Sequence, residues 1–408
     1  PEDIPEWTAT DSVASGLMLL QSLTDYSSQE LLAGRLASEV DPGMATDFLT
    51  PPHIHQNNTM EASGETYDPG GTGSAHLMPR ELDMAAVKER LQSHKSVMKE
   101  AHRKMKLIDE LTGRDLFSHG SNNWVMGPGR TTSGNPMLAN DPHLPLTNPA
   151  LWYLVELDSK TNGNGDLHVS GVSFSGMPGI LLGHNENIAW GGTVAFYDLG
   201  DVYNETLSSD GEGVMYNGEK VAFEKETFTF NFPGGTEDVE MLYVPHHGPV
   251  LSIDREAGTA VSFKWQVHQA RTDLQAFEAL GRAGSVQEAK TALQDMQTAN
   301  QNFVVMDTNG DIGWFPYAEV PSRSWSDMDQ YPYWMPLPGD GNYEWDSNHV
   351  PLEDLPQMEN PSEGFIATAN QDMTGAFADG DPRNETYPPL QTPFMSPGAR
   401  QQRIIDMI

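Results

Sequence analysis

Apolar residues recur at helical spacing in two segments of the first 111 residues. Residues 7–23, WTATDSVASGLMLLQSL, begin with Thr and Asp residues that can cap a helix and continue with an apolar face. A second helix is expected over about 81–111. Residues 41–79 are rich in Pro, Gly, Ser, Thr and Asn, which predicts a long connection.

From residue 121 onward the pattern changes to short β-rich runs separated by Gly, Asn and Pro, such as LHVSGVSFSG, ETFTFNF and NFVVMDTNGDIGWF. Residues 307–318 begin like a calcium-binding loop. However, Ile312 stands at the position of the required glycine and Ala318 at that of the closing glutamate, so a hairpin turn is predicted. One helix, over 285–297, is expected to interrupt the strands.

Charge narrows the possible partners. The 408 residues include 58 acidic and 23 basic side chains, a net charge of −35, which argues against nucleic acid or an anionic membrane. This excess predicts a high-salt habitat, where screening weakens self-repulsion; an acidic secreted protein from a moderate habitat is the alternative. The absence of cysteine excludes disulfides and thiolate chemistry.

Basic residues gather in the second helical segment. Nine of the 23 lie there: Arg80, Lys88, Arg90, Lys95, Lys99, Arg103, Lys104, Lys106 and Arg114. Two interpretations stay open, a solvated helix face and a segment that docks against the acidic body during maturation.

The start of the chain resembles neither a signal peptide nor a membrane anchor. Pro1 is followed by no basic and then apolar region, and no apolar run reaches the length of a membrane span. The chain is therefore interpreted as a mature or truncated piece, with an extracytoplasmic or secreted location expected.

An internal Gly-Ser pair supplies the candidate chemistry. No G-x-S-x-G motif is present, so an α/β-hydrolase nucleophile is excluded. If the peptide bond between Gly120 and Ser121 is cut, Ser121 gains a free α-amino group with an ordinary pKa of about 7.7–8.0, which can act as base for its own hydroxyl. Before cleavage, that hydroxyl can attack the Gly120 carbonyl, because glycine tolerates a strained backbone.

Three segments, in this order, resemble the penicillin acylase family of N-terminal-nucleophile hydrolases: GSNNWVMGPGRTTSGNPMLANDPHL, PGILLGHNENIAWGGTVAFYDLGDVY and NQNFVVMDTNGDIGWFPYAEVPSR. The similarity extends from about Glu6 to the end of the chain, with gaps over 41–115. It implies an α+β fold, an αββα four-layer sandwich with two antiparallel sheets. Members of the family are longer at both ends, so the chain is expected to be an incomplete precursor that includes the processing point.

The resemblance assigns catalytic roles. It makes Ser121 the nucleophile and its freed amine the base, with autocleavage after Gly120. His143 is expected to position the serine amine and hydroxyl. The Val194 backbone N–H and the Asn302 side-chain amide would form the oxyanion hole. Arg323 matches the arginine that orients the amide in relatives.

The resemblance also implies a structural calcium ion and no organic cofactor. Its predicted ligands are Glu30, Asp198, the Gly200 carbonyl and Asp201, all hard oxygen donors of the kind that Ca²⁺ prefers. A solvated acidic turn is the alternative.

Three positions match pocket-lining sites of relatives: Leu144, Leu182 and Gly192. The first two are aromatic in penicillin G acylases and aliphatic here, which predicts a preference for a flexible apolar acyl chain over a phenylacetyl ring. The alternative is that these leucines belong to an ordinary core.

The expected organisation has three parts. Residues 1–45 form the C-terminal part of an α-subunit, 46–120 a connection and excised spacer with the basic helix, and 121–408 the N-terminal part of a β-subunit. The function expected is hydrolysis of the acyl amide bond of penicillin-like or other small N-acyl compounds, with α and β subunits from one precursor as partners. Alternatives are an acyl-homoserine-lactone acylase and a catalytically silent, calcium-stabilised secreted module of the same fold.

Overall fold

A computed structural model describes residues 6–49, 58–69, 81–111, 120–144, 148, 150–161, 163–269, 272–385 and 387–408. Much of the predicted connection and spacer, 50–57, 70–80 and 112–119, therefore lies outside the described residues. The α-helices are α1 (Ala9–Thr24), α2 (Ser27–Glu39), α3 (Pro42–Leu49), α4 (Thr59–Ala62), α5 (Met84–Leu91), α6 (Lys95–Leu111), α7 (Asp273–Arg282), α8 (Val286–Leu293) and α9 (Ala399–Ile405).

The strands form four sheets in the described part of the chain. They are β1 (Gly120–Met126), β2 (Met137–His143), β3 (Trp152–Asp158), β4 (His168–Phe174), β5 (Leu182–His184), β6 (Ile188–Gly191), β7 (Gly200–Thr206), β8 (Gly213–Tyr216), β9 (Glu219–Ala222), β10 (Glu224–Phe232), β11 (Gly235–Val244), β12 (Gly248–Asp254), β13 (Thr259–Trp265), β14 (Val304–Asp307), β15 (Ile312–Trp314), β16 (Leu337–Pro338), β17 (Met358–Glu359) and β18 (Phe365–Thr368).

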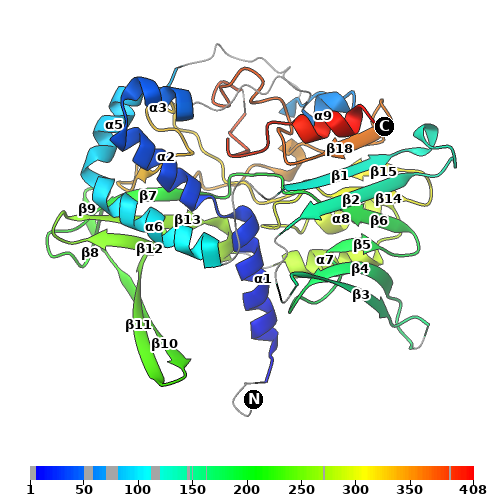
Figure 1. Cartoon of the computed structure of the whole chain (residues 1–408), viewed down its shortest axis with the longest axis horizontal. Helices are drawn as coiled ribbons and strands as arrows, with labels where there is room; N and C mark the ends of the chain where they lie inside the picture. Colours follow the sequence, from blue (N-terminus) through cyan, green and yellow to red (C-terminus); the bar gives the residue numbers. More distant parts are fainter. Residues whose placement is uncertain are drawn as a thin grey trace.

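Two antiparallel sheets face each other across the main core. One has the order β18-β1-β2 and the other β17-β15-β14-β6-β5-β4-β3. Helices α4 and α9 pack on the first sheet, and α7 and α8 on the second (Figure 1). These layers confirm the predicted αββα sandwich.

Strand β1 positions the candidate nucleophile at this core. Side chains alternate between the two faces of a strand, and Ser121, Asn123 and Val125 are the buried set of β1. Val125 packs in a cluster with Val304 and Trp314 of the opposite sheet. Ser121 therefore lies at the end of β1, on the strand face that turns toward the second sheet.

A third sheet, β10-β11-β12-β13-β7-β16, lies beside the sandwich and is covered by α2 and α6, while α5 packs on α2 (Figure 1). The predicted helix over 81–111 is broken by one 3₁₀ turn at Gln92–His94. Its basic residues make specific contacts: Arg90 donates to the carbonyls of Gln330 (3.0 Å) and Pro336 (2.6 Å), and Lys104 donates to that of Leu251 (3.1 Å). The segment packs against the rest of the protein, but the side chains of Lys95, Lys99, Arg103 and Lys106 are exposed, so the helix also has a solvated basic face. Docking during maturation stays a prediction.

Of the other elements predicted from the sequence, some are confirmed, and the structure also contains helices that were not predicted. Helix α1 is confirmed, with Thr8 as its N-cap, and the hairpin is confirmed between β14 and β15. The interval 41–79 contains α3 and α4, which the pattern did not predict because they are short. The sequence also missed α7 and α9. Among the helices of the described residues, none is long and apolar enough to cross a membrane.

Candidate active site

Ser121 is buried, with 6% of its surface exposed, and both its hydroxyl group and its backbone nitrogen are hydrogen-bonded. Its hydroxyl donates to the Gly120 carbonyl at 2.7 Å, and its backbone N–H donates to Asn370 Oδ1 at 2.5 Å. The hydroxyl oxygen thus lies against the carbonyl group that it is predicted to attack.

Gly120 is needed for a different reason from the one expected. It lies in extended β1, and it is absent from the residues with positive φ. A Cβ atom at this position would lie 2.8 Å from Arg400 Nη2 and 3.1 Å from Arg400 Cζ. The close approach of the Arg400 guanidinium, rather than a strained backbone, therefore favours glycine.

Val194 and Asn302 lie on adjoining segments, as an oxyanion hole requires. An isolated bridge joins Val194 and Gln301, and its hydrogen bonds are made by the residues on either side, from Ala195 N to Asn300 O and from Asn302 N to Thr193 O. In such a pair the Val194 N–H points away from the neighbouring segment, and it bonds to no acceptor among the described residues. It is free to bind an oxyanion.

Buried neighbours hold the Asn302 side chain. Its Nδ2 donates to Thr193 Oγ1 (3.1 Å) and more weakly to the Val194 carbonyl (3.3 Å), while its Oδ1 accepts from Trp314 Nε1 (3.1 Å). The indole fixes which end of the amide is the nitrogen, because it can only donate.

His143 does not make the predicted contact with Ser121. In the β1–β2 register Gly120 faces His143 and Ser121 faces Pro142, so the His143 side chain emerges on the other face of the sheet. It is about a third exposed and bonds to Asp141 at 2.9 Å. This hydrogen bond lowers the pKa of Asp141. Among the described residues, Asn370 takes the place at the serine nitrogen.

Arg323 also differs from the prediction. Its fully buried guanidinium donates to Asp201 Oδ2 and Asp198 Oδ1, both at 3.0 Å, and to the Asp198 carbonyl. It joins the acidic cluster rather than orienting Asn302, whose amide is oriented by Trp314 and Thr193.

The predicted calcium ligands gather around Arg323. Glu30 on α2 accepts from the Val202 N–H at 2.9 Å, and burial, followed by the charges of Asp201 and Asp198, raises its pKa well above the usual range. Burial raises the pKa of Asp198 to about 7. Asp201 Oδ1 is buried and has no hydrogen-bond partner in the part of the chain that the structure describes. Gly200 begins β7.

The donors of this cluster are of the kind that Ca²⁺ prefers, because three buried carboxylates face one guanidinium and, among the described residues, Asp201 Oδ1 is unpaired. Their spacing, however, is that of an ion-pair cluster. Arg323 lies between Asp198 and Asp201, and within the described ranges no three His, Cys, Asp or Glu side chains are spaced to hold a metal ion.

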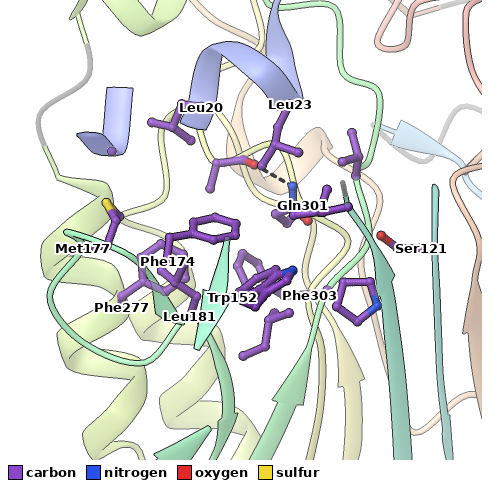
Figure 2. A pocket seen from close by; sticks show the side chains of 17 residues that line it. Leu20, Leu23, Ser121, Trp152, Phe174, Met177, Leu181, Phe277, Gln301 and Phe303 are labelled. Atoms are coloured by element: carbon purple, nitrogen blue, oxygen red, sulfur yellow. Dashed lines mark hydrogen bonds between the residues drawn. The ribbon is translucent and has the colours of Figure 1, made fainter. Parts of the chain in front are cut away.

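An apolar cavity of about 650 Å³, counted to its open mouth, lies beside Ser121 (Figure 2). All three predicted pocket residues, Leu144, Leu182 and Gly192, line it. The other lining residues are Gly16, Leu20, Leu23, Ser121, Pro142, Trp152, Phe174, Met177, Leu181, Val194, Phe277, Ala299, Gln301 and Phe303. Leu144 and Leu182 alone had indicated an aliphatic pocket, but its wall also contains aromatic side chains.

The aromatic side chains of this wall pack in pairs. Trp152 and Phe174 have ring centroids 4.1 Å apart, and Phe277 and Phe303 meet edge to face at 5.9 Å. Sequence reasoning missed all four, and also Asn370 and Arg400. The local signal for Asn370 is the polar run Asn-Gln-Asp that begins two residues after the end of strand β18.

Comparisons with known proteins show the family of this chain. A family model described as penicillin amidase matches residues 1–408. The acyl-homoserine lactone acylase QuiP of Pseudomonas aeruginosa is 30% identical over 265 residues, covering 61% of this chain and 30% of that protein. The penicillin acylase 2 proenzyme of Pseudomonas sp. (strain SE83) is 32% identical over 263 residues, covering 63% of this chain and 32% of that protein.

A solved structure shares the fold. The thermostable penicillin G acylase from Alcaligenes faecalis superimposes with a TM-score of 0.56 at 26% identity, covering 62% of this chain and 44% of that one. The chain spans about a third of the length of the curated relatives. Because the family model matches the whole sequence, this chain belongs to the penicillin amidase family.

Proposed function

We propose that this protein is an amidohydrolase that cleaves small N-acyl amides through Ser121, after cleavage of its own chain between Gly120 and Ser121. The observation that carries the proposal is the position of Ser121, whose hydroxyl lies 2.7 Å from the Gly120 carbonyl oxygen and whose side chain borders the apolar cavity. Nucleophile, scissile bond and acyl pocket therefore coincide.

Self-cleavage would proceed by an acyl shift. Ser121 Oγ attacks the Gly120 carbonyl carbon, its proton passes to the Ser121 nitrogen, and the C–N bond breaks to leave an ester. Water then hydrolyses the ester, which gives the Gly120 carboxylate, the free hydroxyl and a free α-amine.

Substrate cleavage would use the freed groups. The α-amine takes the hydroxyl proton as Oγ attacks the substrate carbonyl. The Val194 N–H would stabilise the oxyanion, and Asn302 Nδ2 would join it by exchanging its weaker bond to the Val194 carbonyl (3.3 Å) for the oxyanion. One such donor is worth roughly 2.7–4 kcal/mol. The amine base returns the proton to the departing amine, and water hydrolyses the remaining acyl ester.

Ser121→Ala tests this function directly. The variant should remain a single chain and lack amidase activity, whereas Ser133→Ala, a change at an exposed serine, should cleave and react as wild type. Intact mass and a panel of chromogenic amides provide the readouts. The same two fragments in Ser121→Ala would exclude self-cleavage by this residue, and a wild-type chain that never cleaves would favour the silent module.

We further propose a linear acyl chain of medium length as the favoured acyl group. The leucines of the pocket support it, and so does the packing of the aromatic rings, which already contact one another in one tilted and one edge-to-face pair. Each buried methylene contributes about 0.8 kcal/mol. Amides from acetyl to dodecanoyl, assayed beside phenylacetyl and N-acyl homoserine lactones, should show a maximum at intermediate linear chains.

A matched pair of variants sharpens this test. Leu182→Trp fills the cavity and should move the optimum to shorter chains, whereas Leu154→Trp, at an exposed leucine of β3, should not. A clear maximum at phenylacetyl would contradict the linear-chain proposal.

We also propose that Glu30, Asp198, the Gly200 carbonyl and Asp201 hold a structural Ca²⁺ that would offset the excess negative charge of this cluster. Added Ca²⁺ should raise the melting temperature of the protein after chelation, and Asp201→Asn should remove this response. An equal response in the variant would contradict these ligands.

A further inference from the structure

The backbone nitrogen of Ser121 donates to Asn370, and Arg400 donates to the same Asn370 oxygen. Sequence analysis singled out neither residue. We propose that Asn370 and Arg400 are positioning residues that hold the freed α-amine of Ser121 and keep it unprotonated. This inference deepens the proposed function and rests on it.

Asn370 presents a fixed acceptor to the nitrogen. It lies two residues after the end of β18, and its Oδ1 accepts from the Ser121 N–H at 2.5 Å. Its Nδ2 donates to the Val194 carbonyl at 3.1 Å, so the amide cannot turn over without losing both bonds. After cleavage, a neutral amine can give one N–H to Asn370 Oδ1 and keep its lone pair for the hydroxyl proton.

Arg400, in the first turn of α9, completes the arrangement. Its Nη2 donates to the same Asn370 Oδ1 at 2.9 Å, and its Nη1 donates to the Ser121 carbonyl at 2.6 Å and to Asn122 Oδ1 at 2.8 Å. These bonds fix the guanidinium in the position where a Gly120 side chain would clash with it.

The charge of Arg400 has a direct consequence for the amine. Both groups bond to one oxygen atom, so a protonated amine would face a like charge at close range, which lowers its pKa. The other titratable side chains near this position are Asp141 and His143 on β2, and Arg403 on α9. All three are substantially exposed and hence screened, so the half-buried Arg400 dominates.

The pH profile of kcat/KM on cleaved enzyme tests the assignment. Activity should fall at acid pH as the amine is protonated. Arg400→Gln removes a positive charge and Asn370→Asp adds a negative one, so both should move the midpoint of this acid limb upward by about one pH unit or more. Arg400→Lys should keep the wild-type midpoint, and Arg403→Gln is the control on the same helix.

Loss of activity without a moved midpoint in Arg400→Gln and Asn370→Asp would overturn the inference, because that is the result of a purely structural role. The inference would also be overturned if both variants failed to cleave but kept the wild-type melting temperature, because the residues would then act on cleavage alone. Wild-type cleavage and its loss in Ser121→Ala test the proposed function separately.

Discussion

At the scale of single residues, a buried group of charges outside the active site surrounds His247. Its Nδ1 lies 2.7 Å from Glu205 Oε1 and its Nε2 lies 2.7 Å from Glu344 Oε1. Burial alone would lower the pKa of His247, but the hydrogen bonds to both glutamates outweigh it and raise the pKa. Burial alone would raise the pKa of Glu344, but His247 and Lys264 lower it to about 2.

These opposite shifts predict a window of maximal stabilisation. The raised pKa of His247 means that its stabilising contribution is complete below the unfolded pKa of about 6.5 and is lost as the pH rises through the folded pKa. The lowered pKa of Glu344 means that its contribution is complete above about pH 4.5 and is lost as the pH falls toward 2. His247→Gln should therefore lower the free energy of unfolding most between about pH 4.5 and 6.5, by about 3–5 kcal/mol.

Denaturant titrations across this pH range measure the effect. His168→Gln, at an exposed histidine paired with Glu156, is the matched control and should change stability little. A loss for His247→Gln that is the same at every pH would contradict the assignment of charge to this histidine.

The sequence predicted the site residues that stand in continuous motifs and not those whose position depends on strand pairing. Ser121, Leu144 and Leu182 stand in continuous motifs, so their positions could be read directly. His143 was assigned the wrong contact because its face depends on strand pairing, which puts Pro142 opposite Ser121. Asn370 approaches Ser121 only through the β1–β18 pairing, which no local pattern reveals.

At the scale of elements, α6 behaves as part of the permanent core rather than as a removable spacer. Val97, Met98, Ala101 and Met105 are buried in one cluster with residues of α2 and β13. Removing the helix would expose that cluster, and each lost core side chain of the size of Met98 costs about 2–5 kcal/mol.

We therefore predict that the excised spacer begins after Leu111. Intact mass of the cleaved protein should show an upstream fragment that still contains α5 and α6. Met98→Ala should lower the melting temperature of the cleaved protein, while Lys99→Ala, at the exposed neighbouring position, should not. An upstream fragment that ends before Met84 would contradict the prediction.

The elements themselves were predicted unevenly. Helix α1 has a long apolar repeat and a capping pair, so its pattern was sufficient. Helices α7 and α9 are short, so their sequence pattern is weak. Their place in the outer helical layers of the sandwich is set by contacts with strands distant in the sequence. The covered third sheet was not predicted, because its strands share their local pattern with those of the sandwich.

At the scale of the whole molecule, the net charge of −35 must be carried by a surface with few compensating cations. Screening shortens the range of this repulsion, with a Debye length of about 10 Å at 0.1 M salt and 3 Å at 1 M. The melting temperature should therefore rise steeply between dilute buffer and molar potassium chloride. An equal rise with sucrose, or a flat response to salt, would contradict an electrostatic cause.

The leucines of α1 that line the cavity have a consequence for how such an enzyme could diversify. Leu20 and Leu23 precede the cleavage point, whereas Ser121 and the opposite wall follow it (Figure 2). One wall of the acyl pocket would then lie on a different polypeptide from the nucleophile and the rest of the pocket. Mutations in one short helix could retune selectivity without touching the residue that breaks the bond, and a β-subunit stripped of its partner would keep its nucleophile but lose one wall of its binding site.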